Sequence, residues 1–213
     1  MKKISAFTMI ELIFVIIIVG ILSAMAIPRI DRDNVIEAAN QMVSDIRYTQ
    51  HLALMDHKFD RLDKDWFKER WTYEVTKSKK NVSTTIFSDK SHTGNPDASE
   101  IAKDPQNPDR LLTGGSNGGL SFGSLKTSEN MLLSKKFSIS NVVFSGGCNG
   151  SKKISFDEFG RPYSALQNAT NPGDKVLKEE CKITIADDAG KEAVISLLPE
   201  TGYVKIISYP TID

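Results

Sequence analysis

The stretch "AFTMIELIFVIIIVGILSAMAIP" constrains this chain most, because it is almost entirely apolar and yet contains Glu11. No charged residue occurs from Leu12 to Pro28, a run about 25 Å long as a helix, which is near the lower limit for crossing a bilayer. Residues 13–18 are apolar on every side of a helix, which disfavours a helix buried on one face only. A cleaved secretory signal is an alternative, since Lys2 and Lys3 precede the run and small residues follow it.

Glu11 is the anomaly in each of these interpretations. An ionised carboxylate on a helix in lipid costs about 2.5–3.5 kcal/mol, so it needs a cationic partner. The apolar run itself contains no basic residue. The partner of Glu11 must therefore be created by processing or supplied by another chain. Lys2 and Lys3 would stay on the cytoplasmic side of a membrane, which directs the rest of the chain to the periplasm.

The residues "FTMIELIFVIIIVGILSAMAIP" resemble the N-terminus of type IV pilins and type II secretion pseudopilins. The resemblance implies that a prepilin peptidase cuts between Ala6 and Phe7 and that the new N-terminus at Phe7 is methylated. It also implies that Glu11 neutralises the terminal amine of a neighbouring subunit, which supplies the missing cation. Ala6 departs from the glycine that the family nearly always has before the cut, and we expect processing to survive the extra methyl group.

The apolar segment continues into an amphipathic pattern. Residues that recur at helical spacing predict one buried stripe, and a single helix is expected from Phe7 to about Met55. Pro28 removes one helical N–H group and is expected to kink this helix, with Gly20 as a second point of bending. The stripe, which we expect to pack on a globular head, consists of Val35, Ala39, Met42, Ile46, Thr49 and Ala53.

The second half of the chain predicts an antiparallel sheet. Short runs rich in β-branched and aromatic residues are separated by turn signals such as "DDAGK" and "PETG", and Gly160 in "FDEFGRP" is expected at another turn. Packed on the helix, these strands predict an α+β, pilin-like fold. From Ile154 to Ile207 the chain also resembles the H-type minor pseudopilins and their FimT-like relatives, which share "F-D-x-x-G-R". We expect Trp66, Phe67 and Trp71 to pack in the core, because large aromatic side chains bury the most area.

The two cysteines, Cys148 and Cys181, leave two possibilities open. In the cytoplasm they would be unrelated buried thiols, whereas outside it a disulfide is favoured. The choice depends on the compartment that the N-terminus implies.

The region 89–130 is dense in Gly, Pro, Asn and Asp and is expected to be a long irregular loop. Its carboxylates invite a calcium interpretation, and some major pseudopilins bind calcium in a loop, but their spacing matches no EF-hand. We therefore expect a solvated loop and no metal. The carboxylates in question are Asp97, Glu100, Asp104 and Asp109.

Neither catalysis nor direct DNA binding is indicated. The histidines, His51, His57 and His92, are expected on the surface, and no P-loop, nucleophile elbow or H-E-x-x-H motif occurs. The chain has 27 basic and 27 acidic residues, so loss of Lys2 and Lys3 would leave a slight acidic excess, unlike a DNA-binding surface. Residues 201–213 contain Lys205 as their one basic residue.

The organisation that we expect is a leader (1–6), a transmembrane helix (7–28), the periplasmic half of the helix (29–57) and a β-rich head (58–213). The expected function is that of a non-enzymatic minor pseudopilin or pilin-like subunit without a cofactor. It would sit in the bacterial inner membrane as a single-pass protein with its head in the periplasm. Its partners would be other subunits, the prepilin peptidase, the inner-membrane assembly platform and lipid. The alternative is a minor pilin of a DNA-uptake pseudopilus.

Overall fold

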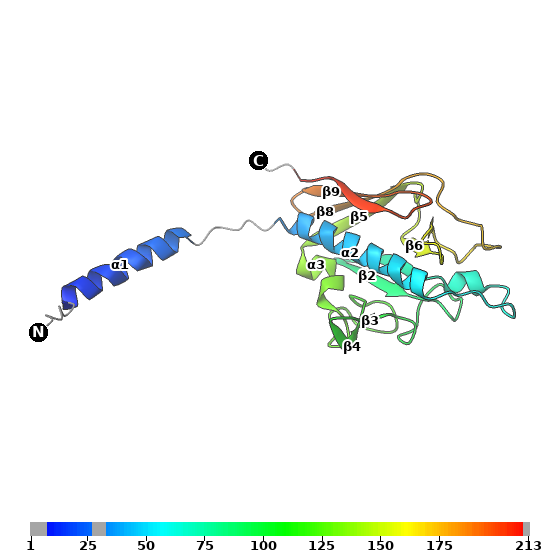
Figure 1. Cartoon of the computed structure of the whole chain (residues 1–213), viewed down its shortest axis with the longest axis horizontal. Coiled ribbons are helices and arrows are strands. Elements are labelled where there is room, and N and C mark those ends of the chain that lie inside the picture. The colour runs from blue at the N-terminus through cyan, green and yellow to red at the C-terminus, as the bar shows by residue number, and fades with distance from the viewer. Residues whose placement is uncertain (1–7, 27–32, 211–213) are drawn as a thin grey trace, which may run out of the picture. The chain divides into compact units, whose positions relative to one another are not determined.

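A computed structural model describes residues 8–26 and 33–210, which form two separate units (Figure 1). The first unit contains the helix α1, Met9–Ala26. The second unit is the head, in which the helix α2, Asn34–Met55, packs on antiparallel sheets. The predicted α+β fold is confirmed, and the helix that covers the sheets is α2.

Asp33 interrupts the single helix that the sequence predicts from Phe7 to Met55. Its backbone is extended, with φ −71° and ψ 94°, and its carboxylate accepts hydrogen bonds from the N–H groups of Val35 and Ile36. This is an N-cap, which satisfies N–H groups that the first turn of a helix leaves without partners. The prediction of one uninterrupted helix is therefore wrong at Asp33. Pro28, the predicted kink, lies outside the described residues.

The buried face of α2 is the one that the sequence predicts. All six residues of the predicted stripe are buried, together with Ala38, Val43 and Asp45. The apolar residues of this face belong to one hydrophobic core cluster. The helix α2 contacts both four-stranded sheets, through β1 and β6 of one and β8, β9 and β10 of the other, so both sheets share this core.

The first sheet has the order β2–β1–β6–β7. Its members are β1 (Thr72–Ser78), β2 (Asn81–Phe87), β6 (Lys153–Phe156) and β7 (Pro162–Tyr163). The second sheet has the order β10–β9–β8–β5 and consists of β5 (Ile139–Gly146), β8 (Cys181–Asp187), β9 (Glu192–Leu197) and β10 (Val204–Ser208). All pairings are antiparallel.

The strand order corrects the expectation that the strands of the second half form one antiparallel sheet. The four strands β5, β8, β9 and β10 lie together, but β6 leaves them and pairs with β1, with Tyr73 opposite Ile154. The β1–β2 hairpin was not predicted either. It turns at Lys79, whose φ is 54°, and six of the seven residues of β2 are buried, so the alternation that marks a half-exposed strand is absent.

The region 89–130 is irregular but not simply a solvated loop. It contains the short hairpin of β3 (Lys103–Asp104) and β4 (Asn107–Leu111), followed by the short helices η2 (Glu129–Met131) and α3 (Leu133–Lys136). The backbone N–H of Ile86 in β2 donates to Leu112, and the N–H of Ala102 donates to Ile86. Ile101 and Leu112 are buried, so this region covers the outer edge of the first sheet.

A short helix, η1 (Trp66–Glu69), links α2 to β1. Phe67 is buried in a small second cluster with Tyr163, Leu166 and Ala169. Trp66 packs partly buried against this cluster, and Trp71 packs against the main core. The predicted core role is thus confirmed for Phe67, while the two tryptophans are half-buried.

Candidate functional site

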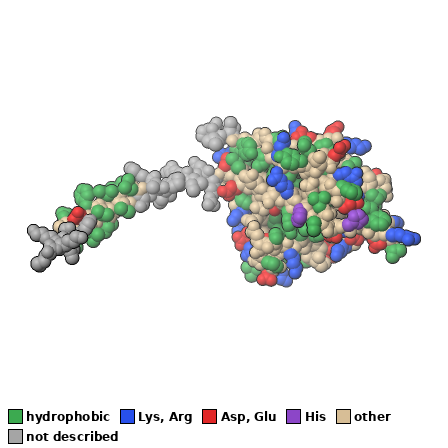
Figure 2. Space-filling view, viewed as in Figure 1, with side chains coloured by type: hydrophobic (Ala, Val, Ile, Leu, Met, Phe, Trp, Pro, Cys, Tyr) green, Lys and Arg blue, Asp and Glu red, His purple; other side chains and the backbone are tan. Residues whose placement is uncertain are grey.

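The described part of α1 is a uniformly apolar surface with one carboxylate in its first turn. Every side chain described from Met9 to Leu22 is exposed, and large hydrophobic side chains cover this surface (Figure 2). Exposed apolar area on this scale is unfavourable in water. Apolar surroundings would therefore be more favourable for this helix than water.

Glu11 lies in the first turn of α1 beside Thr8. The Thr8 hydroxyl is 3.5 Å from a carboxylate oxygen of Glu11, and the Glu11 N–H donates to that hydroxyl oxygen at 3.3 Å. Within residues 8–26 and 33–210, Glu11 forms no ion pair. The carboxylate is thus presented on an apolar helix without a cation from the described parts of its own chain.

The remaining N-terminal sites are only partly covered by the structure. Ala6, Phe7 and Pro28 lie outside the described residues. Gly20 lies inside α1, which is helical on both sides of it, so its part as a bending point stays a prediction. Among the described residues, no helix reaches the length and hydropathy expected of a membrane span.

Residues 1–27 match the family model described as the prokaryotic N-terminal methylation motif. The chain has the N-terminus of a type IV pilin or pseudopilin. In this pilin-like protein the motif supports processing by prepilin peptidase and assembly with other pilin subunits. No curated protein and no solved structure matches the chain.

The head of the pilin-like protein contains a disulfide between Cys148 and Cys181. Cys148 follows β5 and Cys181 opens β8, two neighbouring strands in which Gly146 lies opposite Cys181. Both sulfur-bearing residues are buried in the main core. The bond closes a loop whose ends are 33 positions apart, and this loop carries β6 and β7 to the other sheet.

The "FDEFGR" motif forms a turn whose polar groups are satisfied internally. The Asp157 carboxylate is fully buried; one oxygen accepts from the N–H groups of Phe159 and Arg161, and the other accepts from the Arg161 Nε–H and the Tyr163 hydroxyl. Gly160 has φ 77°, a backbone that favours glycine, as the sequence predicts for a turn. The motif therefore has a structural role here.

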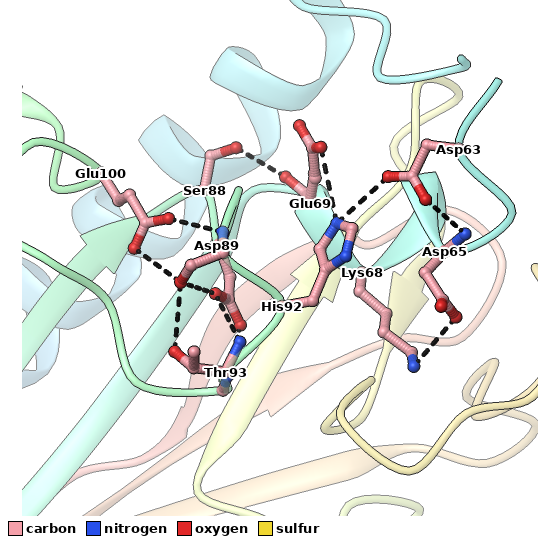
Figure 3. A network of polar contacts seen from close by, with 11 residues as sticks. Asp63, Asp65, Lys68, Glu69, Ser88, Asp89, His92, Thr93 and Glu100 are labelled. Atoms are coloured by element: carbon pink, nitrogen blue, oxygen red, sulfur yellow. Dashed lines mark hydrogen bonds and ion pairs between the residues drawn. The ribbon is translucent and has the colours of Figure 1, made fainter. Parts of the chain in front are cut away.

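The histidines differ in their surroundings. His51 and His57 are exposed, as expected, and the Nε2 atom of His57 is 3.6 Å from Glu158. His92, in contrast, is half-buried, and its Nε2 atom faces Asp63 and Glu69 (Figure 3). The expectation of three surface histidines is therefore wrong for His92.

Hydrogen bonds hold the loop that carries His92 in place. The Asp89 carboxylate, just after β2, accepts from the N–H groups of Thr93 and Gly94, and the N–H of His92 donates to the Asp89 carbonyl. Glu100 accepts from the N–H groups of Ser91 and Asp97. His92 itself has φ 56°, which turns its ring toward the segment 63–69 (Figure 3).

The four carboxylates that invited a calcium interpretation do not converge in the described residues. Glu100 accepts the loop N–H groups just named, whereas Asp104 accepts from the Ser128 hydroxyl and from the N–H of Gln106. Asp97 and Asp109 are exposed. The one group of three potential metal ligands found among the described residues is instead Asp63, Glu69 and His92.

Proposed function

We propose that this pilin-like protein is a minor structural subunit of a type II secretion or type IV pilus-like filament. The observation that carries the proposal is Glu11, a single carboxylate within an exposed apolar helix that also carries the methylation motif. A carboxylate in such surroundings is stabilised only by a partner of opposite charge. In the proposed filament, a neighbouring subunit supplies this positively charged partner.

The proposed step that creates this partner is cleavage between Ala6 and Phe7. The cut exposes a positive amine on Phe7, which is then methylated and remains basic. In a filament, the Phe7 amine of one subunit pairs with Glu11 of the next. Because such a pair in low dielectric is favourable only when its geometry is good, it sets the register of neighbouring subunits.

The proposed location is the bacterial inner membrane, with residues 7–28 in the lipid and the head in the periplasm. Lys2 and Lys3 favour retention of the N-terminus in the cytoplasm. The disulfide supports an oxidising compartment for the head, since such bonds persist outside the cytoplasm. An assembly platform in the inner membrane would extract the processed subunit from the lipid.

We assign no catalytic activity and no direct DNA binding to the head. Basic and acidic side chains are interspersed over the face of the head in view in Figure 2, rather than gathered in a basic groove. A DNA-uptake filament remains the alternative machine, with other subunits as the DNA-binding ones. A gel-shift titration at low salt tests this point, and a salt-dependent shift at micromolar protein would assign DNA binding to this chain.

The filament role is tested by Glu11→Val, with Ile13→Val as a matched control on the same helix. Cleavage of the leader is measured by intact mass of membrane-extracted protein, and incorporation is measured by co-purification with sheared filaments. We expect cleavage of both variants and loss of incorporation for Glu11→Val alone. Normal incorporation of Glu11→Val would refute the pairing of Phe7 with Glu11, and a leader that is never removed would refute the processing step.

A further inference from the structure

We propose that Asp63, Glu69 and His92 form a binding site for a divalent transition metal of the zinc class. The three residues come from segments on either side of the β1–β2 hairpin: Asp63 precedes η1, Glu69 ends it, and His92 lies in the loop after β2 (Figure 3). Their ligand atoms all lie within 4.8 Å of one another. The proposal is independent of the filament role.

The spacing of the ligand atoms suits a tetrahedral ion. The Nε2 atom of His92 is 3.4 Å from an oxygen of Asp63 and 3.5 Å from an oxygen of Glu69. Zinc binds nitrogen and oxygen ligands at about 2.0–2.1 Å, so neighbouring corners of its tetrahedron are about 3.3–3.4 Å apart. The two distances from the Nε2 atom of His92 are therefore near those that one shared ion would set, and the two carboxylate oxygens lie within 4.8 Å of each other.

The same distances fit a simple ion pair less well. A charged N–H group that donates to a carboxylate is typically about 2.7–2.9 Å from it. One N–H group also cannot point well at two separate carboxylates. In the described structure the Nε2 atom of His92 is buried and has no hydrogen-bond partner. A buried ring nitrogen that faces two carboxylates without bonding to either is the arrangement that a metal ion completes.

The surrounding contacts orient the ligands. The second oxygen of Asp63 accepts from the N–H of Asp65, and the Glu69 carbonyl accepts from the Ser88 hydroxyl. Lys68 lies nearby, but its ammonium group pairs with Asp65 at 3.0 Å and leaves the triad to a metal (Figure 3). Outer contacts of this kind fix metal ligands in place.

Charge and access also favour a metal ion. Two carboxylates and a neutral imidazole carry two negative charges, which a divalent cation balances. The side chains of Asp63, Glu69 and His92 are 31%, 25% and 23% exposed, so an ion can enter from solvent. Both cysteines are held in the disulfide and do not compete for the metal. A nitrogen ligand favours zinc over calcium, which binds oxygen.

The test uses the full-length, untagged chain in a non-denaturing detergent, stripped with EDTA and titrated with zinc sulfate by calorimetry at neutral pH. We expect one zinc ion per chain with a Kd in the micromolar range or tighter, and a visible absorption spectrum of tetrahedral cobalt when Co²⁺ replaces zinc. At a zinc concentration of about 100 times Kd, the melting temperature should rise by about 5–10 °C.

The variants His92→Asn and Glu69→Gln should each bind zinc at least about tenfold more weakly. Asparagine tolerates the left-handed backbone of His92, so His92→Asn keeps the loop conformation. The matched control is His57→Asn, which removes an exposed histidine beside a single carboxylate and should bind zinc as the natural chain does. Melting temperatures in EDTA report whether each variant is folded.

Two results would overturn the assignment. One is a natural chain that binds no zinc, or binds it with a Kd weaker than about 0.1 mM. If His92→Asn then also lowers the melting temperature in EDTA, the three side chains are an ion-pair cluster. The other is equal zinc affinity in His92→Asn, Glu69→Gln and the natural chain, which would place the bound zinc elsewhere.

Discussion

Asp45 is a carboxyl group on the buried face of α2, and its replacement by asparagine should stabilise the head. One carboxyl oxygen accepts from the side-chain amide of Gln41 at 2.8 Å, but the other is buried without a hydrogen-bond partner in the described residues. Burial raises the pKa of Asp45 to about 8, and the nearby carboxylate of Asp104 adds to the rise. The nearby Tyr73 hydroxyl is also buried and without a partner there, and burial raises its pKa well above the ordinary value.

The sign of the pH effect follows from the two states. The folded chain holds the proton of Asp45 up to a pH of about 8, whereas the ordinary pKa of 3.8 applies to the unfolded chain. This contribution to stability is complete below pH 3.8 and is lost as the pH rises through 8. Each pH unit between 3.8 and 7 costs the folded state about 1.4 kcal/mol, so the loss reaches at most about 4 kcal/mol at pH 7.

Water in the adjoining cavity reduces this upper bound. A cavity of about 130 Å³ is lined by both Asp45 and Asp104, among other residues, and its volume admits water that solvates a charged carboxylate. We therefore expect Asp45→Asn to gain about 1–4 kcal/mol at pH 8, and a smaller amount of at most about 1.6 kcal/mol at pH 5. Asparagine keeps the oxygen that accepts from Gln41.

The assay is urea unfolding of the full-length chain in detergent, followed by circular dichroism at pH 5 and pH 8. Asp188→Asn, at an exposed carboxylate in the β8–β9 turn, is the control for the loss of one negative charge. The reasoning is refuted if Asp45→Asn and the natural chain lose the same stability between pH 5 and pH 8. It is refuted equally if Asp45→Asn is the less stable chain at pH 8.

Two further predictions concern the covalent chemistry of the chain. Replacing Cys148 and Cys181 together by alanine should cost about 4 kcal/mol, because the loop closed by the disulfide spans 33 positions, and should lower the melting temperature by about 8–15 °C. Dithiothreitol should lower the melting temperature of the natural chain by a similar amount and leave the double variant unchanged; free thiols in the oxidised natural chain would contradict this. Ala6→Gly should be cleaved by prepilin peptidase at least as fast as the natural chain in a pulse-chase experiment, and slower cleavage would show that the peptidase prefers Ala6 here.

The sequence predicts those features of the fold that depend on local pattern. The stripe from Val35 to Ala53 is visible because burial on one helix face repeats every three or four residues. The strands β5, β8, β9 and β10 are visible because β-branched residues fill them. The capping role of Asp33 could also have been found, since aspartate before a helix is a recognised start signal.

The pairing of strands could not be predicted in the same way. Alternation reports which face of a strand is buried but not which strand lies beside it, so nothing local assigns β6 to β1. The cluster of Asp63, Glu69 and His92 could not be predicted from the sequence for a similar reason. Asp63 and Glu69 are far from His92 in the sequence, and they meet it only because the β1–β2 hairpin reverses the chain and Asp89 fixes the following loop.

The disulfide also limits how far this protein can be stretched. In the filament role that we propose, retraction would place the chain of each subunit under tension, and a domain under tension lengthens by unfolding. If the segment between Cys148 and Cys181 could unfold and extend, it would lengthen the chain by roughly 110 Å, at about 3.3–3.6 Å per residue. The disulfide links Cys148 directly to Cys181, so a force applied to the two ends of the head is transmitted through this bond. The segment between the cysteines, which contains β6 and β7, therefore bears no tension along its chain. Traction on an oxidised subunit would therefore extend it by about 110 Å less than traction on a reduced one.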